Sequence, residues 1–414
     1  MNKLVYSSFL ASVIVASACS NGTNGNTDDI NNSTDTLPPV ETNKGNTDYK
    51  PAFEGQTRAK GVKTSTAFES KVITSSLKSP WGIAVLPDGR LLITEKPGDM
   101  RIVSMDGTVS EPLQGIPEVD SEAQGGLLGV TLDPDFASNR MVYWVFSEPV
   151  ANGNHTAVAK GKLAEDEKSI QSAQVIFRTT PTYKGKLHYG GRIIFDKTGH
   201  LFVSSGERSD LETRPLAQDL KSTLGKLVRI TKDGKPGTNN PFASNADALP
   251  EIYSYGHRNP QGLAFHPETG DLWSSEFGPR GGDELNLIQA GKNYGWPTIT
   301  YGIEYSGSVI GDPPIQAKEG LEQPVYYWDP VLSPSGMTFY SGDAIPEWKN
   351  NLFIAGLSST HIARLVIKDN KVVGEERLLA KEGERFRDVV QGQNGELFAV
   401  TDSGKLYSIS KKAN

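Results

Sequence analysis

The segment Pro87–Thr94 reads PDGRLLIT, a turn of the Asp-Gly type followed at once by a short apolar strand. Asp196–Val203, which reads DKTGHLFV, repeats the unit with equal clarity. Three more copies lie at residues 267–273, 348–354 and 393–400, and a sixth, less regular copy lies at 135–144. A turn and strand that return at spacings of tens of residues indicate a fold built from repeated blades of sheet.

Six such units predict an all-β fold, a six-bladed β-propeller with antiparallel four-stranded blades around a central channel. Second strands follow several units, for example at residues 100–103, 226–230 and 405–409. A further strand pattern at 68–73 is placed to complete the last blade and close the ring. The alternative is a pair of β-sandwiches or an irregular all-β fold. In a propeller the loops between inner strands meet at one mouth, so residues distant in sequence are expected to form the functional site there.

The composition agrees with a large all-β unit. The 414 residues include 43 Gly and 25 Pro, 36% of them are hydrophobic, and long amphipathic helical stretches are hard to find. The net charge is −7 and no basic run rises above the mixed background, which argues against a nucleic-acid partner. An anionic ligand would therefore be held by local arginines.

The first 63 residues are expected to lie outside the propeller. Residues 1–18 combine a positive charge at Lys3 with a short apolar stretch, the pattern of a secretory signal peptide. Cys19, the only cysteine, follows small residues, and this resembles the lipobox of bacterial lipoproteins; ordinary signal cleavage is the alternative. Residues 19–63, rich in Asn, Thr, Gly and Asp, are predicted to be the lipidated N-terminus and a disordered tether, leaving 64–414 as the propeller. The expected location is the periplasmic side, as an outer-membrane lipoprotein.

Two polar clusters carry residues suited to proton transfer and to binding an oxygen-rich ligand. His188 begins the segment HYGGR (188–192), where two glycines allow the backbone to approach a ligand and the imidazole can accept a proton. Arg258 and Asn259, in the segment YGHRNPQGL (255–263), offer a forked cation beside an amide. Taken singly, His188 is better explained as a structural or surface histidine, and the alternative for the second cluster is that Arg258 pairs with a carboxylate and Asn259 lies in a turn before Pro260.

Two further clusters carry carboxylates and arginines. The segment EFGPRGGDELN (276–286) places acidic residues in a glycine-rich loop, where carboxylates and backbone carbonyls supply the oxygen ligands that calcium prefers. Arg385 and Arg387 occupy alternate positions of a strand, so both side chains can meet one anion. An acidic loop without metal and surface ion pairs are the alternatives.

Taken together and in this order, the four clusters resemble the soluble quinoprotein glucose dehydrogenases and, more closely, the bacterial aldose sugar dehydrogenases. The resemblance runs from residues 79–82 (SPWG) to Tyr407 and includes AQGGLLG at 123–129. It implies an enzyme that oxidises the anomeric hydroxyl of aldose sugars to lactones with pyrroloquinoline quinone (PQQ) and Ca²⁺. The implied partners are the sugar, an unidentified downstream electron acceptor and the membrane reached by the lipid anchor.

The resemblance also implies a role for each matching residue. His188 matches the general base, Arg258 the residue that stabilises charge on the quinone, and Glu207 an acidic residue near the histidine. The quinone-binding positions are Gln124, Arg258, Asn259, Tyr305, Arg385 and Arg387. The carbonyls of Gly278 and Pro279 match ligands of the calcium that polarises the quinone, and Glu284 and Tyr294 match ligands of a second, structural calcium.

One position departs from the family pattern. The family usually has a quinone-binding lysine about 27 residues before Arg385, where this chain has Ser358; Arg364 or Lys368 could supply the missing charge. Two other functions stay open. One is a calcium-dependent propeller lactone hydrolase, which has no use for Arg385 and Arg387, and the other is a non-catalytic binding propeller.

Overall fold

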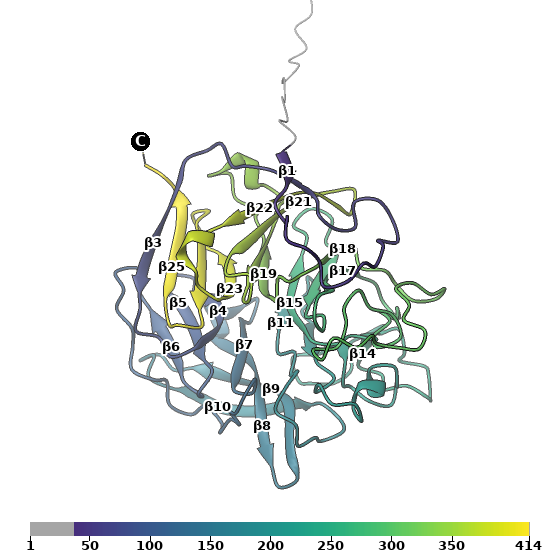
Figure 1. The fold of residues 1–414 in the computed structure, drawn as a ribbon. Coiled ribbons are helices and arrows are strands. Elements are labelled where there is room, and N and C mark those ends of the chain that lie inside the picture. Colours follow the sequence, from purple (N-terminus) through teal and green to yellow (C-terminus); the bar gives the residue numbers. More distant parts are fainter. Residues whose placement is uncertain (1–36, 414) are drawn as a thin grey trace, which may run out of the picture. The chain divides into compact units, whose positions relative to one another are not determined.

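The computed structural model describes residues 37–413, and their secondary structure is almost entirely β (Figure 1). The helices are single turns: α1 (Phe136–Asn139) and the 3₁₀ helices η1 (Arg214–Ala217), η2 (Pro346–Trp348) and η3 (Ala380–Glu382). Among residues 37–413, none of these helices has the length and apolarity needed to cross a membrane. The predicted signal peptide and Cys19 lie outside the described residues.

The strands form six sheets, and the strands of each blade pair antiparallel, which confirms the six-bladed propeller; the one parallel pairing joins β2 to β22 at an outer edge. The first blade contains β4 (Pro80–Val85), β5 (Leu91–Glu95) and β6 (Met100–Val103), and the second contains β7 (Leu127–Leu132), β8 (Met141–Val150), β9 (Gly153–Leu163) and β10 (Ile170–Arg178). The third contains β11 (Ile193–Phe195), β12 (Leu201–Ser205), β13 (Lys226–Ile230) and β14 (Ile252–Tyr255), and the fourth contains β15 (Pro260–Phe265), β16 (Leu272–Glu276), β17 (Asp283–Ile288) and β18 (Tyr326–Trp328). The fifth contains β19 (Pro334–Phe339), β20 (Leu352–Gly356), β21 (Ile362–Lys368) and β22 (Lys371–Leu378), and the sixth contains β23 (Phe386–Gln391), β24 (Leu397–Thr401), β25 (Leu406–Lys411) and β3 (Phe68–Thr74).

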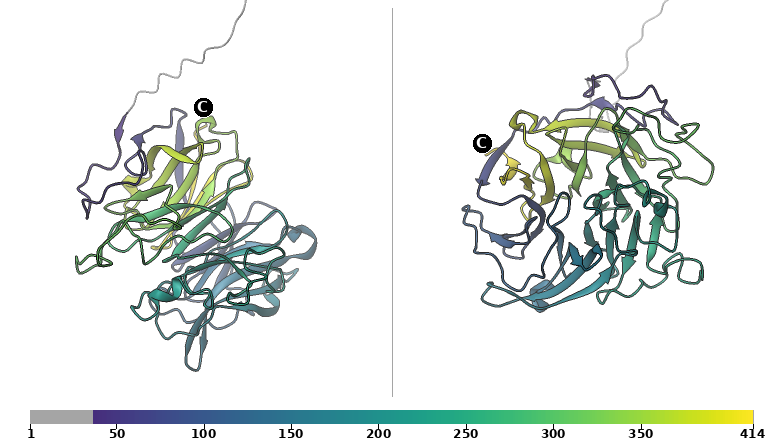
Figure 2. Two further views of the ribbon diagram at one scale, coloured as in Figure 1. Left: turned by 90° about the vertical axis from the view of Figure 1, so that its right-hand side faces the viewer. Right: turned by 60° about the horizontal axis from the view of Figure 1, so that its bottom comes forward.

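The first strand of each blade faces the centre. β4, β7, β11, β15, β19 and β23 contact one another in sequence around the ring, as the right-hand view of Figure 2 shows for the blades. The second strands, such as β5 and β20, are buried at every position because adjacent blades cover both faces. This explains why the repeated units read as continuous apolar runs.

The ring closes where the sequence predicts. β3 pairs antiparallel with β25, with Phe68 opposite Lys411 and Thr74 opposite Leu406, so the final blade uses a strand from each end of the propeller. Two blades depart from four strands. The first has three, its fourth reduced to an isolated bridge between Val103 and Val109, and the fifth carries the extra strands β1 (Leu37–Pro39) and β2 (Lys60–Gly61).

The described part of the expected tether, residues 37–63, differs from a free chain. We call residues 41–59 the strap. Gln56 is fully buried, and its side chain accepts a hydrogen bond from the Tyr301 hydroxyl (3.0 Å) and donates one to the Pro324 carbonyl (2.9 Å). The Ala59 N–H donates to the Tyr326 hydroxyl at 2.9 Å. These polar residues are ordered by hydrogen bonds to the fourth blade rather than by apolar burial, so composition alone did not reveal their order.

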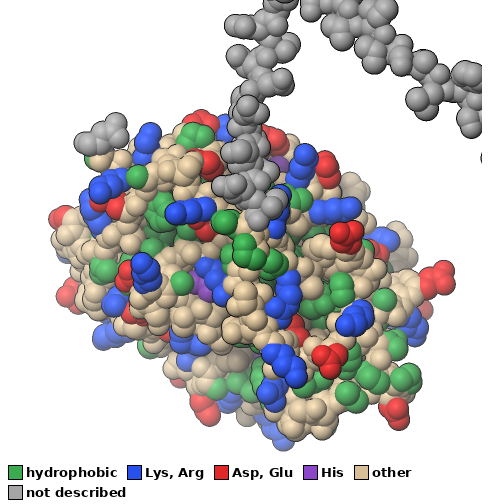
Figure 3. All heavy atoms as spheres, turned by 45° about the horizontal axis from the view of Figure 1, so that its top comes forward, with side chains coloured by type: hydrophobic (Ala, Val, Ile, Leu, Met, Phe, Trp, Pro, Cys, Tyr) green, Lys and Arg blue, Asp and Glu red, His purple; other side chains and the backbone are tan. Residues whose placement is uncertain are grey.

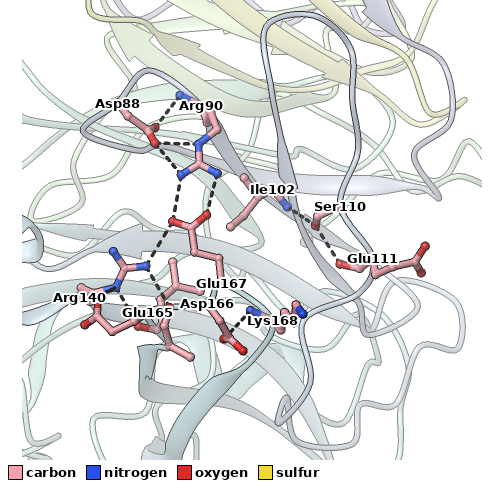
Figure 4. Close-up of polar contacts among 12 residues, drawn as sticks. Asp88, Arg90, Ile102, Ser110, Glu111, Arg140, Glu165, Asp166, Glu167 and Lys168 are labelled. Carbon is pink, nitrogen blue, oxygen red and sulfur yellow. Dashed lines mark hydrogen bonds and ion pairs between the residues drawn. The ribbon is translucent and has the colours of Figure 1, made fainter.

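Ion pairs link the first two blades at the periphery (Figure 4). The Arg90 guanidinium, from the turn before β5, donates to both carboxylate oxygens of Glu167 at 2.7 and 2.9 Å, and Arg140 donates to the same carboxylate at 3.3 Å. The hydrogen bond from Arg90 lowers the pKa of Glu167 below its usual value.

Candidate active site

A cavity of about 430 Å³ lies where loops from several blades meet. Its lining includes Gln124 before β7, His188 before β11, Tyr305, and Arg385 before β23. The face in Figure 3 shows basic and acidic side chains interspersed. An anionic ligand in the cavity would therefore be held by individual arginines rather than by a broad positive field.

His188 is held in a strained and enclosed position. Its φ is 46°, in the left-handed region that non-glycine residues rarely adopt, and its side chain is almost fully buried. The backbone N–H donates to Gln124 Oε1 at 2.9 Å, and Nδ1 lies 2.7 Å from Glu207 Oε1. Glu207 follows β12, and its other oxygen accepts the Ser209 N–H at 2.9 Å. Gln124 and Glu207 therefore fix the backbone and the ring of His188.

The surroundings of His188 favour a neutral imidazole. Burial is the largest effect, and together with the nearby Arg258 guanidinium it lowers the pKa of His188 to about 4, against the opposing influence of Glu207. A neutral imidazole that donates from Nδ1 to Glu207 keeps its lone pair on Nε2. His188 is thus prepared to accept a proton at neutral pH.

Arg258 and Asn259 lie at the end of the third blade and carry unsatisfied donors. Arg258 Nη1 donates to the carbonyls of Phe277 (3.2 Å) and Gly278 (2.6 Å), and its guanidinium lies 5.2 Å from the Trp296 ring centroid. Asn259 Oδ1 accepts the Gly190 N–H at 3.0 Å. Arg258 Nε and Asn259 Nδ2 are buried without a hydrogen-bond partner. Buried donors without partners are costly, so they mark a place where a ligand oxygen fits.

Arg385 and Arg387 project toward the same carboxylate. Arg385 Nε donates to Asp402 at 2.9 Å, and Arg387 donates to both Asp402 oxygens at 2.9 and 3.2 Å. Although burial raises the pKa of Asp402, the two guanidinium groups lower it overall. Asp402 thus orients the pair of arginines and keeps part of their donor capacity for another anion.

Ser358 lies in the same cavity. Its hydroxyl accepts from the Ser333 hydroxyl at 2.9 Å and lies 3.5 Å from Arg385 Nη1. Arg364 does not reach the cavity and therefore does not replace the family lysine. It is buried and bound to Glu376, Asn351 and the Glu347 carbonyl. Lys368 ends β21 and is exposed outside the cavity lining.

The loop between β16 and β17 is braced by Asp283. This buried carboxylate accepts the N–H groups of Gly278 (2.9 Å), Leu332 (2.8 Å) and Ser333 (2.7 Å). Burial raises its pKa to about 6, and the three hydrogen bonds act in the opposite direction. Asp283 therefore joins two loops of the cavity and fixes Gly278 and Pro279, which line it.

Glu284 belongs to a small adjoining cavity, which Gly278, Pro279 and Glu276 also line. Asn286 Nδ2 donates to both Glu276 and Glu284, at 3.1 Å each. Burial, and then the Glu276 carboxylate, raise the pKa of Glu284 well above its usual value. Two carboxylates so close are disfavoured without a cation between or beside them.

Tyr294 is arranged differently from Glu284. Its hydroxyl donates to the Leu287 carbonyl (2.7 Å) and accepts the Gln289 N–H (2.9 Å), and its ring stacks on His257 at 4.7 Å. Only its backbone carbonyl remains for a metal. Among residues 37–413, no group of three or more His, Cys, Asp or Glu side chains is arranged to hold a metal ion.

The structure brings most of the predicted residues to one place. The main cavity is lined by Gln124, His188, Gly278, Pro279, Tyr305 and Arg385. Glu207 and Arg387 contact residues near it, and Arg258 and Glu284 line the adjoining cavity. Tyr294 lines neither of the two cavities.

Three supporting residues were missed from the sequence. Asp283 stood in a quoted segment without a role, and its position at the start of β17 gave no hint of three backbone partners. Asp402 and Asn46 carried no signal, because their partners lie 15 to 17 and 234 to 284 residues away respectively.

Comparison with known proteins identifies the family. The sequence model of the glucose/sorbosone dehydrogenase family matches residues 77–408. The aldose sugar dehydrogenase of Escherichia coli (strain K12) is 42% identical over 346 residues, which are 83% of this chain and 92% of that protein. This chain is a member of the glucose/sorbosone dehydrogenase family, a family of oxidoreductases.

Two solved structures show the same likeness in three dimensions. The apo form of the soluble aldose sugar dehydrogenase from Escherichia coli has a TM-score of 0.80 and 41% identity, covering 84% of this chain and 100% of that chain. The PQQ-bound form of an aldose sugar dehydrogenase from Streptomyces coelicolor has a TM-score of 0.69 and 32% identity, covering 84% of this chain and 99% of that chain.

Proposed function

We propose that this protein oxidises the anomeric hydroxyl of aldose sugars to lactones, using PQQ and Ca²⁺. The observation that carries the proposal is the buried His188–Glu207 pair, with 2.7 Å between Nδ1 and Oε1, in a cavity that also presents Arg385 and the exposed Tyr305 ring. The neutral imidazole of His188 is suited to remove a proton from the substrate. The donors that Arg385 does not use for Asp402 are suited to bind an anionic cofactor.

The donors around the cavity fit the quinone. Its carboxylates are to be met by Arg385 and Arg387, and its ring oxygens by Arg258 Nε and Asn259 Nδ2, the two buried donors without partners. Tyr305, which is 72% exposed, offers a ring face for contact with a flat cofactor.

The Pro279 carbonyl and the second lone pair of the Gly278 carbonyl, whose first lone pair accepts from Arg258, suit the calcium beside the quinone, since Asp283 holds their loop in place. Glu284 suits a second, structural calcium, because a cation there would offset the repulsion from Glu276. The relatives' names support the quinone and the sugar, and the calcium sites rest on these donor sets.

The chain's own contribution to the reaction is proton removal and orientation. His188 Nε2 accepts the proton of the anomeric hydroxyl, and Glu207 stabilises the imidazolium that forms. Arg258, whose buried Nε lacks a partner, would place positive charge beside the bound quinone. When bound, the quinone supplies the acceptor for the hydride, and calcium polarises it.

The test is reconstitution of purified protein. Adding PQQ with calcium should produce a bound-quinone spectrum and aldose-dependent reduction of an artificial dye. A protein that binds quinone but reduces no dye would support the binding propeller, for which Ser358 in place of the family lysine is the best argument. Calcium-dependent cleavage of a lactone without any quinone would support the hydrolase. Either result would overturn the proposal.

A further inference from the structure

The strap reaches the wall of the active-site cavity. Asn46 lines the cavity together with Arg280, Pro330 and Val331. The match to the family model begins at residue 77, so the strap lies outside the matched residues. A segment outside the matched residues thus contributes to the site.

Charged side chains hold the strap at both of its ends. Arg58 donates to the carbonyls of Glu41 (2.9 Å), Asn43 (2.7 Å) and Asp329 (2.9 Å), which closes the strap into a loop on the propeller. The Glu41 carboxylate accepts from Arg377 of β22 at 2.6 Å. These contacts define one position for Asn46.

Every polar group of the Asn46 side chain is engaged with protein. Nδ2 donates to Asp329 Oδ1 (3.1 Å) and to the Pro330 carbonyl (3.0 Å), and the backbone N–H donates to Asp329 Oδ1 (2.8 Å). Oδ1 accepts from Arg280 Nε at 3.1 Å. Asn46 therefore has little left to offer a ligand, and its effect passes to Arg280.

Arg280 lines the cavity without a carboxylate partner in the described residues. Of the two arginines that line the cavity, Arg385 is paired with Asp402, whereas Arg280 has no carboxylate partner within residues 37–413. Its two terminal nitrogens have no hydrogen-bond partner among those residues, while Nε is held by Asn46. Arg280 is exposed at the cavity wall, and a guanidinium anchored there through Nε, with two free terminal donors, matches a pair of neighbouring hydroxyl groups.

We propose that Arg280 contacts adjacent hydroxyl groups of the aldose and helps to determine specificity, and that Asn46 of the strap is its positioning residue. The inference rests on the proposed function. The strap would thus take part in substrate recognition through the hydrogen bond that Arg280 Nε donates to Asn46 Oδ1.

The experiment is a double-mutant cycle in the full chain reconstituted with PQQ and calcium. Asn46→Ala, Arg280→Ala and the double variant are compared for aldose KM, kcat, quinone affinity of the apoprotein and melting temperature. Asn43→Ala is the matched control, since this strap asparagine uses only backbone atoms and lies outside the cavity lining. Loss of a charge-assisted hydrogen bond predicts a KM about tenfold higher for Arg280→Ala, with kcat and quinone affinity nearly unchanged.

Asn46→Ala should raise KM in the same direction, and the double variant should be no worse than Arg280→Ala alone, because Asn46 acts through Arg280. Additive effects, unchanged KM in both single variants, or a loss of quinone affinity in place of a KM effect would overturn the inference while leaving the proposed function intact. A wild-type protein that binds quinone without oxidising any aldose would instead overturn the proposed function, and this inference with it.

Discussion

At His188, burial and the neighbouring Arg258 lower the imidazole pKa to about 4, so the free apoprotein should hold this residue neutral well below pH 6. An NMR titration of the histidine ring protons in the apoprotein should show two midpoints near 4, because burial also lowers the pKa of His361 to about 4, and only the midpoint of His188 should be absent from His188→Ala. In Glu207→Gln the midpoint should fall further, because the carboxylate favours the protonated ring. A midpoint at or above pH 6.5 for His188 would contradict the buried environment described for its ring.

The lowered pKa of His188 also makes the free energy of unfolding depend on pH. The unfolded chain protonates His188 near the ordinary value of about 6.5, whereas the folded chain does so only near 4. Proton uptake therefore favours the unfolded state, and the contribution of this residue to stability falls as the pH drops through that window.

Ser358 provides a second test at the scale of one residue. Ser358→Lys places a cation beside Arg385, whose Nη1 lies 3.5 Å from the serine hydroxyl, in the cavity proposed for the quinone. We expect quinone affinity to rise about tenfold through a charge-assisted contact. Ser138→Lys, on exposed helix α1 and outside the cavity, should leave the affinity unchanged. Equal affinities in Ser358→Lys and wild type would show that another cation already fills this role.

At the scale of elements, the hairpin of β16 and β17 carries the Glu276–Glu284 pair. The raised pKa of Glu284 means that its ionised form destabilises the metal-free fold. Glu284→Gln should raise the melting temperature of the apoprotein by a few degrees and abolish stabilisation by added calcium. Glu122→Gln, an exposed control, should keep the calcium response. A calcium response that survives in Glu284→Gln would exclude this residue as a ligand.

The same elements show what could be predicted from the sequence. β5, β12 and β24 were identified because blades cover both their faces, which demands an apolar run after each turn. His188 and Arg258 were found because their motifs are local. The contacts that make the site work are not local: Asn46 binds Asp329 across 283 residues, and such pairings depend on how the blades meet. The strap was expected to be disordered because its polar composition gives no sign of these long-range contacts.

At the scale of the whole molecule, the N-terminal sequence bears on where the enzyme acts. We propose that Cys19 is lipidated and anchors the protein at a membrane facing the periplasm, on the evidence of the apolar stretch and small residues before it. Cys19→Ser should move the protein from the membrane to the soluble fraction without changing its melting temperature. Membrane association that survives the substitution would rule out the lipid anchor.

The ring of blades brings His188, which precedes the third blade, to a cavity that Arg385, which precedes the sixth blade, also lines, and we propose that arginines of the sixth blade hold the cofactor there. The most direct measurement compares wild type and His188→Ala, both saturated with PQQ and calcium, for the rate of aldose-dependent dye reduction. Cofactor binding should be equal, since no cofactor contact is assigned to His188, and the rate should fall by about 10²–10⁴-fold, the usual contribution of a positioned base. If His188→Ala oxidises aldoses at nearly the wild-type rate, His188 is not the base and the account is contradicted.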